Sequence, residues 1–196
     1  MKIERIHHVA YRCKDAVQTV EWYRKYLGMD FVLAIAEDQV PSTGAPDPYM
    51  HVFLDAGSGN VLAFFELPNS PPMGRDGNTP EWVQHIAFKV GSVKDLEETK
   101  ARLEADGIAV VGITDHTIFK SIYFFDPNGI RLELSAQLAS EMQMLAESRT
   151  AHARLGEWNA RKAQWRADRA AGKGPVVLKP QRNDRPEVAA RGKPAA

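Results

Sequence analysis

An internal repeat limits the fold of this chain more than any other feature. The stretch His8-Val9-Ala10-Tyr11-Arg12 corresponds to His85-Ile86-Ala87-Phe88-Lys89, with the same alternation of side chains and a basic residue at the same place. In each half, a strand pattern is followed by a helical pattern and then by three further strand patterns. Self-similarity of this length indicates two copies of one supersecondary unit. We therefore expect an α+β protein of paired βαβββ modules, with modules at about residues 1–68 and 80–137 and a domain boundary after residue 137.

The expected elements follow from hydrophobic periodicity and from turn residues. In the first module, Asp15 is a suitable N-cap and Gly28 ends the helix. Its strands are expected at 3–12, 31–36, 49–54 and 61–67, with a polar, proline-bearing loop at 37–48 that is long enough to cover a site. The second module is expected to contain strands at 82–90 and 108–113, a helix at 93–105 and a final hairpin at 122–135.

Charge and cysteine content exclude several classes of function. The chain has 25 basic and 25 acidic residues and a net charge of zero, so nothing attracts it to nucleic acid or to an anionic membrane surface. No apolar run approaches the roughly 20 residues that span a bilayer. The single cysteine, Cys13, cannot form an internal disulfide, and charged residues stand where a signal peptide needs an apolar core. We expect a cytoplasmic protein with no nucleic-acid and no membrane partner.

The final hairpin concentrates side chains that can carry chemistry. His116, Tyr123 and Glu133 lie within one short stretch that is interrupted by the turn Asp126-Pro127-Asn128-Gly129. Side chains alternate along a strand, so Glu133 lies on the polar face of the last strand, opposite an apolar face. A carboxylate in the middle of a strand faces water, pairs with a cation or binds a ligand.

Four potential metal ligands occupy related positions in the two modules. His8 corresponds to His85, and Glu66 corresponds to Glu133 when the two turns are aligned, although the first module has extra residues between its turn and its glutamate. Modules placed side by side could bring all four residues to one centre. Imidazole and carboxylate ligands suit Fe(II), Zn, Ni or Mn, and two histidines with one carboxylate suit Fe(II) oxygen chemistry. Whether Glu66 is a ligand stays open.

Over residues 1–137 the chain resembles the vicinal oxygen chelate superfamily, which includes glyoxalase I, methylmalonyl-CoA epimerase, fosfomycin resistance proteins, bleomycin resistance proteins and type I extradiol dioxygenases. The resemblance implies a U-shaped mixed sheet around a divalent metal. The order His116, Ile122-Tyr123, Asp126-Pro127, Gly129 and Glu133 is similar to the extradiol ring-cleavage signature.

By that similarity, His8, His85 and Glu133 would be the iron ligands, and His116 and Tyr123 would contact the bound catecholate. The resemblance implies a single-domain dioxygenase that uses Fe(II) and O2 to cleave a catechol-type aromatic substrate.

Two departures from the extradiol pattern keep other functions open. Asn60 stands where two-domain extradiol enzymes have an acid-base histidine, and Glu66 stands where glyoxalase- and epimerase-like members keep a fourth ligand. With four ligands the metal would serve as a Lewis acid in a lyase or isomerase. A third reading is a non-catalytic protein that binds a small molecule in the same fold. The aromatic residues expected to line a pocket are Phe64, Phe119, Tyr123 and Phe125.

The composition changes after Leu138. Residues 138–171 are rich in Ala, Glu, Arg and Gln and predict one long amphipathic helix, weakened at Gly156. Residues 172–196 predict an extended tail. The apolar stripe of the helix could pack on its own domain or on another subunit, and we expect a homo-oligomer, with a dimer as the simplest form. The stripe consists of Leu138, Met142, Leu145, His152, Leu155, Trp158 and Trp165.

Overall fold

The computed structural model describes residues 1–173, so the predicted tail lies outside the described residues except for its first two positions. Residues Met1–Ser140 form one compact unit, and the long helix α3 (Glu141–Ala170) belongs to a second. Among residues 1–173, no helix combines the length and the hydrophobicity needed to cross a bilayer.

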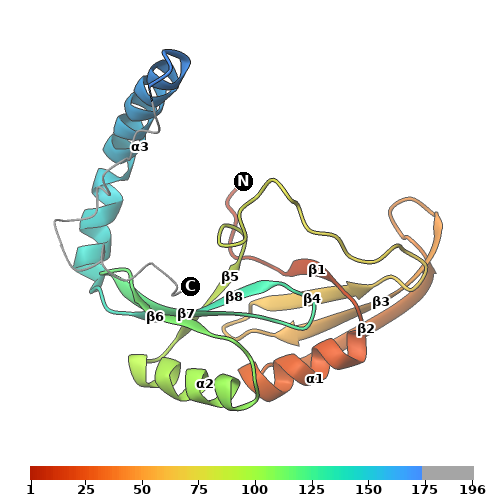
Figure 1. Ribbon diagram of the computed structural model, residues 1–196. Coiled ribbons are helices and arrows are strands. Elements are labelled where there is room, and N and C mark those ends of the chain that lie inside the picture. The colour runs from red at the N-terminus through yellow and green to blue at the C-terminus, as the bar shows by residue number, and fades with distance from the viewer. Residues whose placement is uncertain (174–196) are drawn as a thin grey trace. The chain divides into compact units, whose positions relative to one another are not determined.

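The first unit consists of two βαβββ modules, as the repeat predicts (Figure 1). Each module forms a four-stranded mixed sheet in which its first strand pairs in parallel with its last, giving the orders β1-β4-β3-β2 and β5-β8-β7-β6. The α+β fold class is confirmed. The elements are β1 (Val9–Cys13), α1 (Ala16–Leu27), β2 (Asp30–Gln39), β3 (Pro46–Asp55), β4 (Val61–Glu66), β5 (Ile86–Val90), α2 (Val93–Ala105), β6 (Val111–Asp115), β7 (Phe119–Phe125) and β8 (Arg131–Gln137).

The core lies between the sheets and the helices α1 and α2, which cover the same side of the two sheets (Figure 1). Alternation along the strands sends every second side chain to this helix-covered face. The residues of that face are almost fully buried, whereas the intervening residues point to the opposite face. The buried set in the central strands consists of Val52, Leu54, Leu62, Phe64, Ile122, Phe124, Leu132, Leu134 and Ala136.

Helix α1 begins and ends at the residues that the sequence indicates. The Asp15 side chain accepts a hydrogen bond from the backbone N–H of Gln18, which satisfies one of the free donors at the helix start. Gly28 ends the helix in the left-handed conformation, with φ of 63°. The start of this helix lies beside Glu66, whose Oε2 accepts a hydrogen bond from the backbone N–H of Ala16.

Several predicted boundaries are wrong. The first strand begins at Val9 and not at Ile3, so His8 lies just outside the sheet. The fifth strand, expected from residue 82, begins at Ile86, and the sixth, expected at 108–113, spans Val111–Asp115. The expected loop at 37–48 is largely strand, because β2 and β3 continue as a hairpin and leave only residues 40–45 between them. Period-two patterns do not reveal where pairing stops, and cross-strand partners decide that.

The turn between β7 and β8 joins the two modules through α1. The carboxylate of Asp126 is buried, and it accepts a hydrogen bond from the hydroxyl of Tyr23 at 3.1 Å. Asn128 donates to the hydroxyl of Thr19 and accepts from the backbone N–H of Lys14. The Asp-Pro-Asn-Gly motif therefore anchors the second module to the first helix, in addition to turning the hairpin.

Helix α3 runs without interruption from Glu141 to Ala170, so the predicted weakness at Gly156 does not break it. No side chain in this helix is buried within the described residues. The apolar residues Met142, Leu145, Leu155 and Trp158 are exposed. The helix therefore has no core of its own in this part of the chain.

Candidate metal centre

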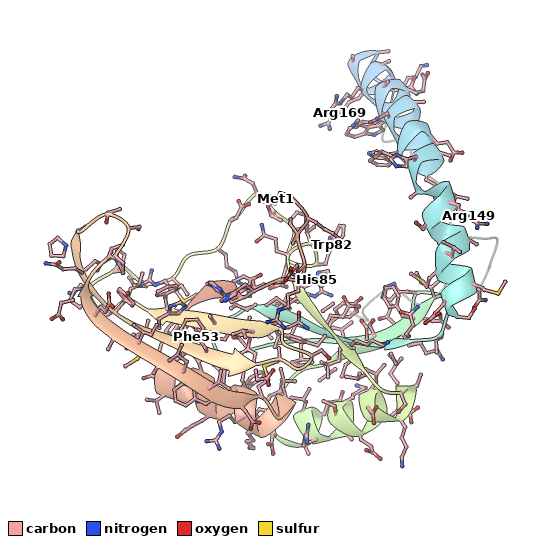
Figure 2. The ribbon with its side chains drawn as sticks, turned by 180° about the vertical axis from the view of Figure 1, so that it is seen from behind. Met1, Phe53, Trp82, His85, Arg149 and Arg169 are labelled. Atoms are coloured by element: carbon pink, nitrogen blue, oxygen red, sulfur yellow. The ribbon has the colours of Figure 1, made fainter. Side chains whose placement is uncertain are left out.

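Two of the predicted ligands, His85 and Glu133, are in direct contact. His85 immediately precedes β5, and Glu133 lies in β8 beside Ala87 of β5. The Nε2 atom of His85 is 2.9 Å from Oε2 of Glu133. His85 projects from the side of the sheets opposite α1 and α2 (Figure 2). The parallel pairing of β5 with β8 thus brings together residues that are far apart in the sequence.

Each of these side chains has a second polar atom that is held by the protein. The Nδ1 atom of His85 lies 3.0 Å from the carbonyl oxygen of Val83, which can only accept, so Nδ1 carries a proton. In a neutral ring, Nε2 is then unprotonated. Oε1 of Glu133 accepts hydrogen bonds from the hydroxyls of Ser121 at 2.5 Å and of Ser135 at 2.8 Å. Each side chain therefore directs one unused acceptor atom toward the other.

Two acceptors at this distance need a proton or a cation between them. Imidazolium at His85 would satisfy the contact, and so would a divalent metal bound to both atoms. Two ligands that lie about 2.1 Å from one metal and subtend a right angle are about 3.0 Å apart. Support of the outer ring nitrogen and of the outer carboxylate oxygen is also the usual arrangement around protein metals. The pair His85 and Glu133 therefore fits a divalent metal.

The surroundings of Glu133 favour its ionised form. The side chain is 4% exposed, and burial acts to raise its pKa. Hydrogen bonds from Ser121, Ser135 and Tyr123, together with the nearby His85, outweigh burial and lower the pKa of Glu133 below its ordinary value. The carboxylate is therefore charged at neutral pH and ready to bind a cation.

The predicted catalytic pair, His116 and Tyr123, is also assembled. Tyr123 lies in β7 directly opposite Glu133, and its hydroxyl is 2.7 Å from Nε2 of His116, which follows β6. The Tyr123 and His85 rings meet edge to face, with centroids 6.1 Å apart. Burial, followed by the negative charge of Glu133, raises the pKa of Tyr123. Tyr123 therefore keeps its proton at neutral pH and can donate a hydrogen bond beside the His85–Glu133 pair.

The third predicted ligand, His8, lies in a different group of side chains. Its ring is 6.3 Å from the ring of His51 and 6.0 Å from that of Phe53. Its Nδ1 atom is 2.8 Å from Nδ1 of His7, although strand alternation predicts that these two side chains point apart. The alternation fails because both residues precede β1. Across residues 1–173, no three His, Cys, Asp or Glu side chains are close enough to hold one metal ion.

Glu66 does not occupy the position equivalent to Glu133. The pairing of β1 with β4 sets Ala10 beside Ala63, and the pairing of β5 with β8 sets Ala87 beside Glu133. Ala63 is therefore the repeat equivalent of Glu133, and the alignment of Glu66 with Glu133 is wrong. The extra residues between turn and glutamate shift Glu66 by three positions, an odd number, which moves it to the helix-covered face. There its Oε2 accepts a hydrogen bond from the backbone N–H of Ala16, at the start of α1.

Several residues around the centre escaped prediction from the sequence. Ser121 and Ser135 share the polar face of Glu133 at two-residue spacing, and this pattern could have indicated their contact with its carboxylate. Near His8, His51 is 9% exposed and stacks on Phe65 with centroids 3.5 Å apart. Its buried Nε2 has no hydrogen-bond partner among the described residues. Burial and then the neighbouring His8 lower the pKa of His51.

The aromatic residues predicted to line a pocket divide between two faces. Phe64 is fully buried and packs on Tyr23 of α1, so it belongs to the core. Phe119 lies against the ring of His116. Phe125 lines a cavity beside His85.

Asn60 lies in the turn between β3 and β4, where its side-chain amide donates to the carbonyl of Gly57.

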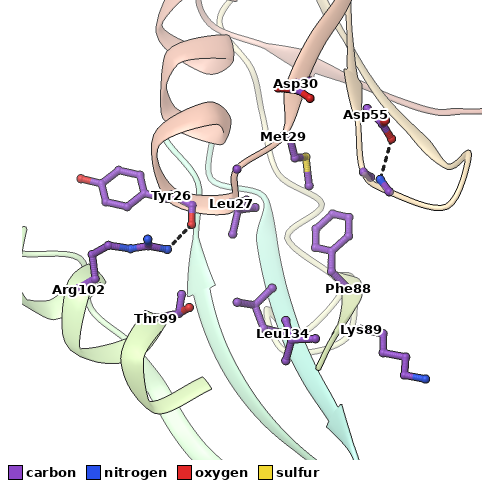
Figure 3. Close-up of a pocket in the computed structure, with 14 residues that line it drawn as sticks. Tyr26, Leu27, Met29, Asp30, Asp55, Phe88, Lys89, Thr99, Arg102 and Leu134 are labelled. Atoms are coloured by element: carbon purple, nitrogen blue, oxygen red, sulfur yellow. Dashed lines mark hydrogen bonds between the residues drawn. The ribbon is translucent and has the colours of Figure 1, made fainter. Parts of the chain in front are cut away.

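Two cavities border the sheets. One, of about 760 Å³, contains His85 and extends under the segment at residues 73–84. The other, of about 520 Å³, lies between the end of α1, the β3–β4 turn, β5 and α2 (Figure 3). Phe88 and Leu134 line the second cavity from the helix-covered face, and Arg102 donates to the carbonyl of Tyr26 at its side. None of the predicted ligands lines the second cavity, and His85 is the one predicted ligand that lines the first.

The two βαβββ modules and the side chains on their helix-free face define a protein of the glyoxalase fold. A sequence model of the Glyoxalase/Bleomycin resistance protein/Dioxygenase superfamily matches residues 5–134, which is more than half of the chain. The chain belongs to this superfamily, as the sequence resemblance predicts.

Similar proteins from bacteria agree with this assignment. MhqA of Bacillus subtilis strain 168, which carries the name of a ring-cleaving dioxygenase, is 29% identical over 139 residues. That match covers 69% of this chain and 41% of MhqA, so the chain spans about two fifths of MhqA. The uncharacterized protein YwkD of the same organism is 28% identical, over 70% of this chain and 100% of YwkD. The crystal structure of a glyoxalase family protein from Enterococcus faecalis is 28% identical, with a TM-score of 0.51, and the match covers 69% of this chain and 99% of that one.

Proposed function

We propose that this protein is a metal-dependent extradiol dioxygenase that cleaves the ring of an aromatic diol. The observation that carries this proposal is the strand register that makes Ala63 the equivalent of Glu133. Alanine has no ligand atom, so the candidate set is His8, His85 and Glu133. Two histidines and one carboxylate leave several metal positions open, which is the donor set of non-haem Fe(II) oxygen chemistry.

The four-ligand alternative, a glyoxalase- or epimerase-like lyase or isomerase, depends on Glu66. That carboxylate lies on the opposite face of β4 from Ala63 and binds the start of α1. The name of MhqA also favours ring cleavage. Fe(II) is accordingly the metal of our proposal, ahead of Mn, Ni and Zn.

Each side chain of the centre has a role that follows from its contacts. His85 and Glu133 would hold Fe(II). His8 precedes β1 as His85 precedes β5, and it would have to leave its contacts with His7 and His51 to become the third ligand. When bound there, Fe(II) would supply the activation of O2 that ring cleavage requires. Tyr123 keeps its proton and orients the ring by donating a hydrogen bond, and His116, which contacts the Tyr123 hydroxyl, relays protons to or from the substrate oxygen.

The test combines metal analysis with oxygen uptake. Protein reconstituted with Fe(II) under anaerobic conditions should consume O2 with at least one member of a panel of substituted catechols and release a yellow ring-opened product. Glu133→Ala should lose iron, whereas Tyr123→Phe should keep iron and lose turnover by about 10²- to 10⁴-fold. Glu66→Gln is the matched control, because we expect it to keep both iron and turnover.

Two results would contradict this function. The first is iron-loaded protein that consumes no oxygen with any diol but converts a hemithioacetal or epimerises an acyl-CoA. The second is loss of metal in Glu66→Gln as well as in His8→Ala, His85→Ala and Glu133→Ala. Either result would return the assignment to the four-ligand class.

A further inference from the structure

The cavity beside His85 contains a cation that has no carboxylate partner. Its walls come from β1 and the residue that follows it, the segment at 73–85 and the β7–β8 hairpin. Among its charged residues, Arg75 forms an ion pair with Glu81, and Asp76 accepts hydrogen bonds from Thr79 and Asn78. Within residues 1–173, Arg131 forms no ion pair. The charged side chains and the histidine that line the cavity are Lys14, Arg75, Asp76, Glu81, His85 and Arg131.

Arg131 is held in a defined position by the aromatic ring beside it. It lies in β8 two residues before Glu133, so both side chains point to the helix-free face. Its guanidinium group lies over the ring of Tyr123, 4.5 Å from the centroid. A half-buried guanidinium group stacked on an aromatic ring loses little further freedom when it binds a ligand.

The charge balance of the cavity favours an anionic ligand. Three cationic side chains and two carboxylates line it, and the two carboxylates already have partners. Lys14, the other cation without a carboxylate, donates to the carbonyl of Pro127 and is exposed. Arg131 is therefore the cation best placed to meet a ligand that reaches His85.

We propose that Arg131 binds a carboxylate substituent of the aromatic diol and so determines substrate class. This inference rests on the function proposed above. Side chains two residues apart on one face of a strand are separated by about 7 Å, which suits one benzene ring with a diol at Glu133 and a carboxylate at Arg131. The guanidinium fork matches a carboxylate with two parallel hydrogen bonds, and neither a neutral catechol nor a longer acyl chain offers this match.

Binding measurements on the full chain test this inference without relying on turnover. Calorimetry under anaerobic conditions, with the Fe(II)-loaded protein, would compare three probes: 3,4-dihydroxybenzoate, catechol and benzoate. The wild-type protein should bind 3,4-dihydroxybenzoate at least about 10-fold more tightly than catechol, the effect expected of a charge-assisted hydrogen bond. Arg131→Met should weaken the affinity for 3,4-dihydroxybenzoate by about 10- to 100-fold. The affinity for catechol should change by less than about 3-fold.

Two further variants separate charge from shape. Arg131→Lys keeps the charge but loses the fork, and its affinity for 3,4-dihydroxybenzoate should fall between those of wild type and Arg131→Met. Arg75→Met removes a cation of the same cavity that Glu81 already neutralises, so it should leave all three affinities unchanged. Iron content and circular dichroism would establish that each variant is folded and loaded.

The outcomes distinguish this inference from the function on which it rests. If Arg131→Met weakens the affinity for catechol as much as the affinity for 3,4-dihydroxybenzoate, Arg131 acts by orienting Tyr123. The assignment of Arg131 to a substrate carboxylate is then wrong. If the wild type binds both diols equally, the assignment is also wrong while ring cleavage stands. If benzoate binds in an Arg131-dependent manner and neither diol binds more tightly than benzoate, Arg131 does bind an anion. The proposed ring cleavage of a diol is then contradicted. Binding of none of the three probes would overturn both.

Discussion

The two oxygens of Glu133 have different tasks. Oε1 is held by the hydroxyls of Ser121 and Ser135, and Oε2 faces His85. The hydroxyls fix the orientation of a carboxylate that would otherwise rotate, and they stabilise its charge in a buried position. A site of this kind is sensitive to residues that never touch the metal.

Ser121→Ala and Ser135→Ala should each lower the affinity for Fe(II) by about 10- to 100-fold, because the carboxylate loses a donor and its pKa rises. The double variant should lose more than either single one. Competition with a coloured chelator measures the affinity, and Ser70→Ala, outside the site, is the control. Unchanged affinity in the double variant would show that Glu133 is not a ligand.

The environment of His51 should make the free energy of unfolding depend on pH. Burial and then His8 lower its pKa in the folded protein, whereas an unfolded histidine titrates near pH 6.5. As the pH falls below about 6.5, the unfolded chain binds a proton that folded His51 does not. The free energy of unfolding therefore decreases, by up to about 1.4 kcal/mol per pH unit until the folded pKa is reached.

His51→Phe keeps an aromatic ring against Phe65 and removes the titrating group. Urea unfolding of metal-free protein at pH 7.5 and pH 5.5 should show a smaller loss of stability for His51→Phe than for wild type. Equal losses in the two proteins would contradict a lowered pKa at His51.

At the level of elements, hairpins and turns hold the two modules in place. The β6–β7 hairpin carries His116 and Tyr123, and the β7–β8 turn anchors the second module to α1. Both connections depend on backbone positions and buried polar contacts that tolerate few substitutions. Their loss should reduce stability and displace His116 and Tyr123 together.

Gly112→Ala tests the β6–β7 hairpin. Gly112 has φ of 118°, and a Cβ there would lie 2.6 Å from the carbonyl oxygen of Ser121. The strained conformation and the overlap should lower the free energy of unfolding by about 3 kcal/mol. Gly74→Ala, where a Cβ meets nothing within 4 Å, is the control and should change stability by less than about 1 kcal/mol. Urea unfolding measures both, and equal stabilities would contradict the prediction.

Tyr23→Phe tests the link between modules. The hydroxyl of Tyr23 donates to the buried carboxylate of Asp126, and hydrogen bonds to charged groups contribute about 1.5–3 kcal/mol. We expect a loss of that size in the free energy of unfolding. Tyr49→Phe removes a hydroxyl that contacts the exposed carboxylate of Glu37. This variant should lower the free energy of unfolding much less than Tyr23→Phe does. A larger loss in Tyr49→Phe would contradict this account.

At the level of the whole molecule, the chain divides after Ser140. The first unit contains the core and the candidate centre, whereas α3 has no buried side chain among the described residues. A unit with its own core can fold alone. The predicted homo-oligomer stays a prediction, and the exposed apolar residues of α3 make this helix the segment to examine for it.

Ending the chain at Ser140 should therefore leave cooperative thermal unfolding within about 4–8 °C of the full chain and leave Fe(II) affinity unchanged. Calorimetry and chelator competition measure the two quantities, and analytical ultracentrifugation of both chains measures their mass in solution. A truncated chain that fails to unfold cooperatively would show that residues 141–196 complete the core.

The sequence determined the local features of this protein. Turn residues, helix caps and hydrophobic periodicity depend on neighbours in the chain, so the repeat, the ends of α1 and the hairpin with Tyr123 and Glu133 could be predicted from residues alone. The contact of His85 with Glu133 was also accessible, because the two occupy defined positions in one repeated unit.

Only the tertiary structure decided which residues share a face across strands. A shift of one position in strand pairing reverses the face of every side chain, and the sequence aligned Glu66 with Glu133 across a turn of uncertain length. The pairing of β1 with β4 shows that Ala63, and not Glu66, is the equivalent of Glu133. The carboxylate of Glu66 instead accepts a hydrogen bond from the start of α1. The surroundings of His8, the serine support of Glu133 and the position of Arg131 over the Tyr123 ring likewise depend on contacts between separate segments, which local patterns do not encode.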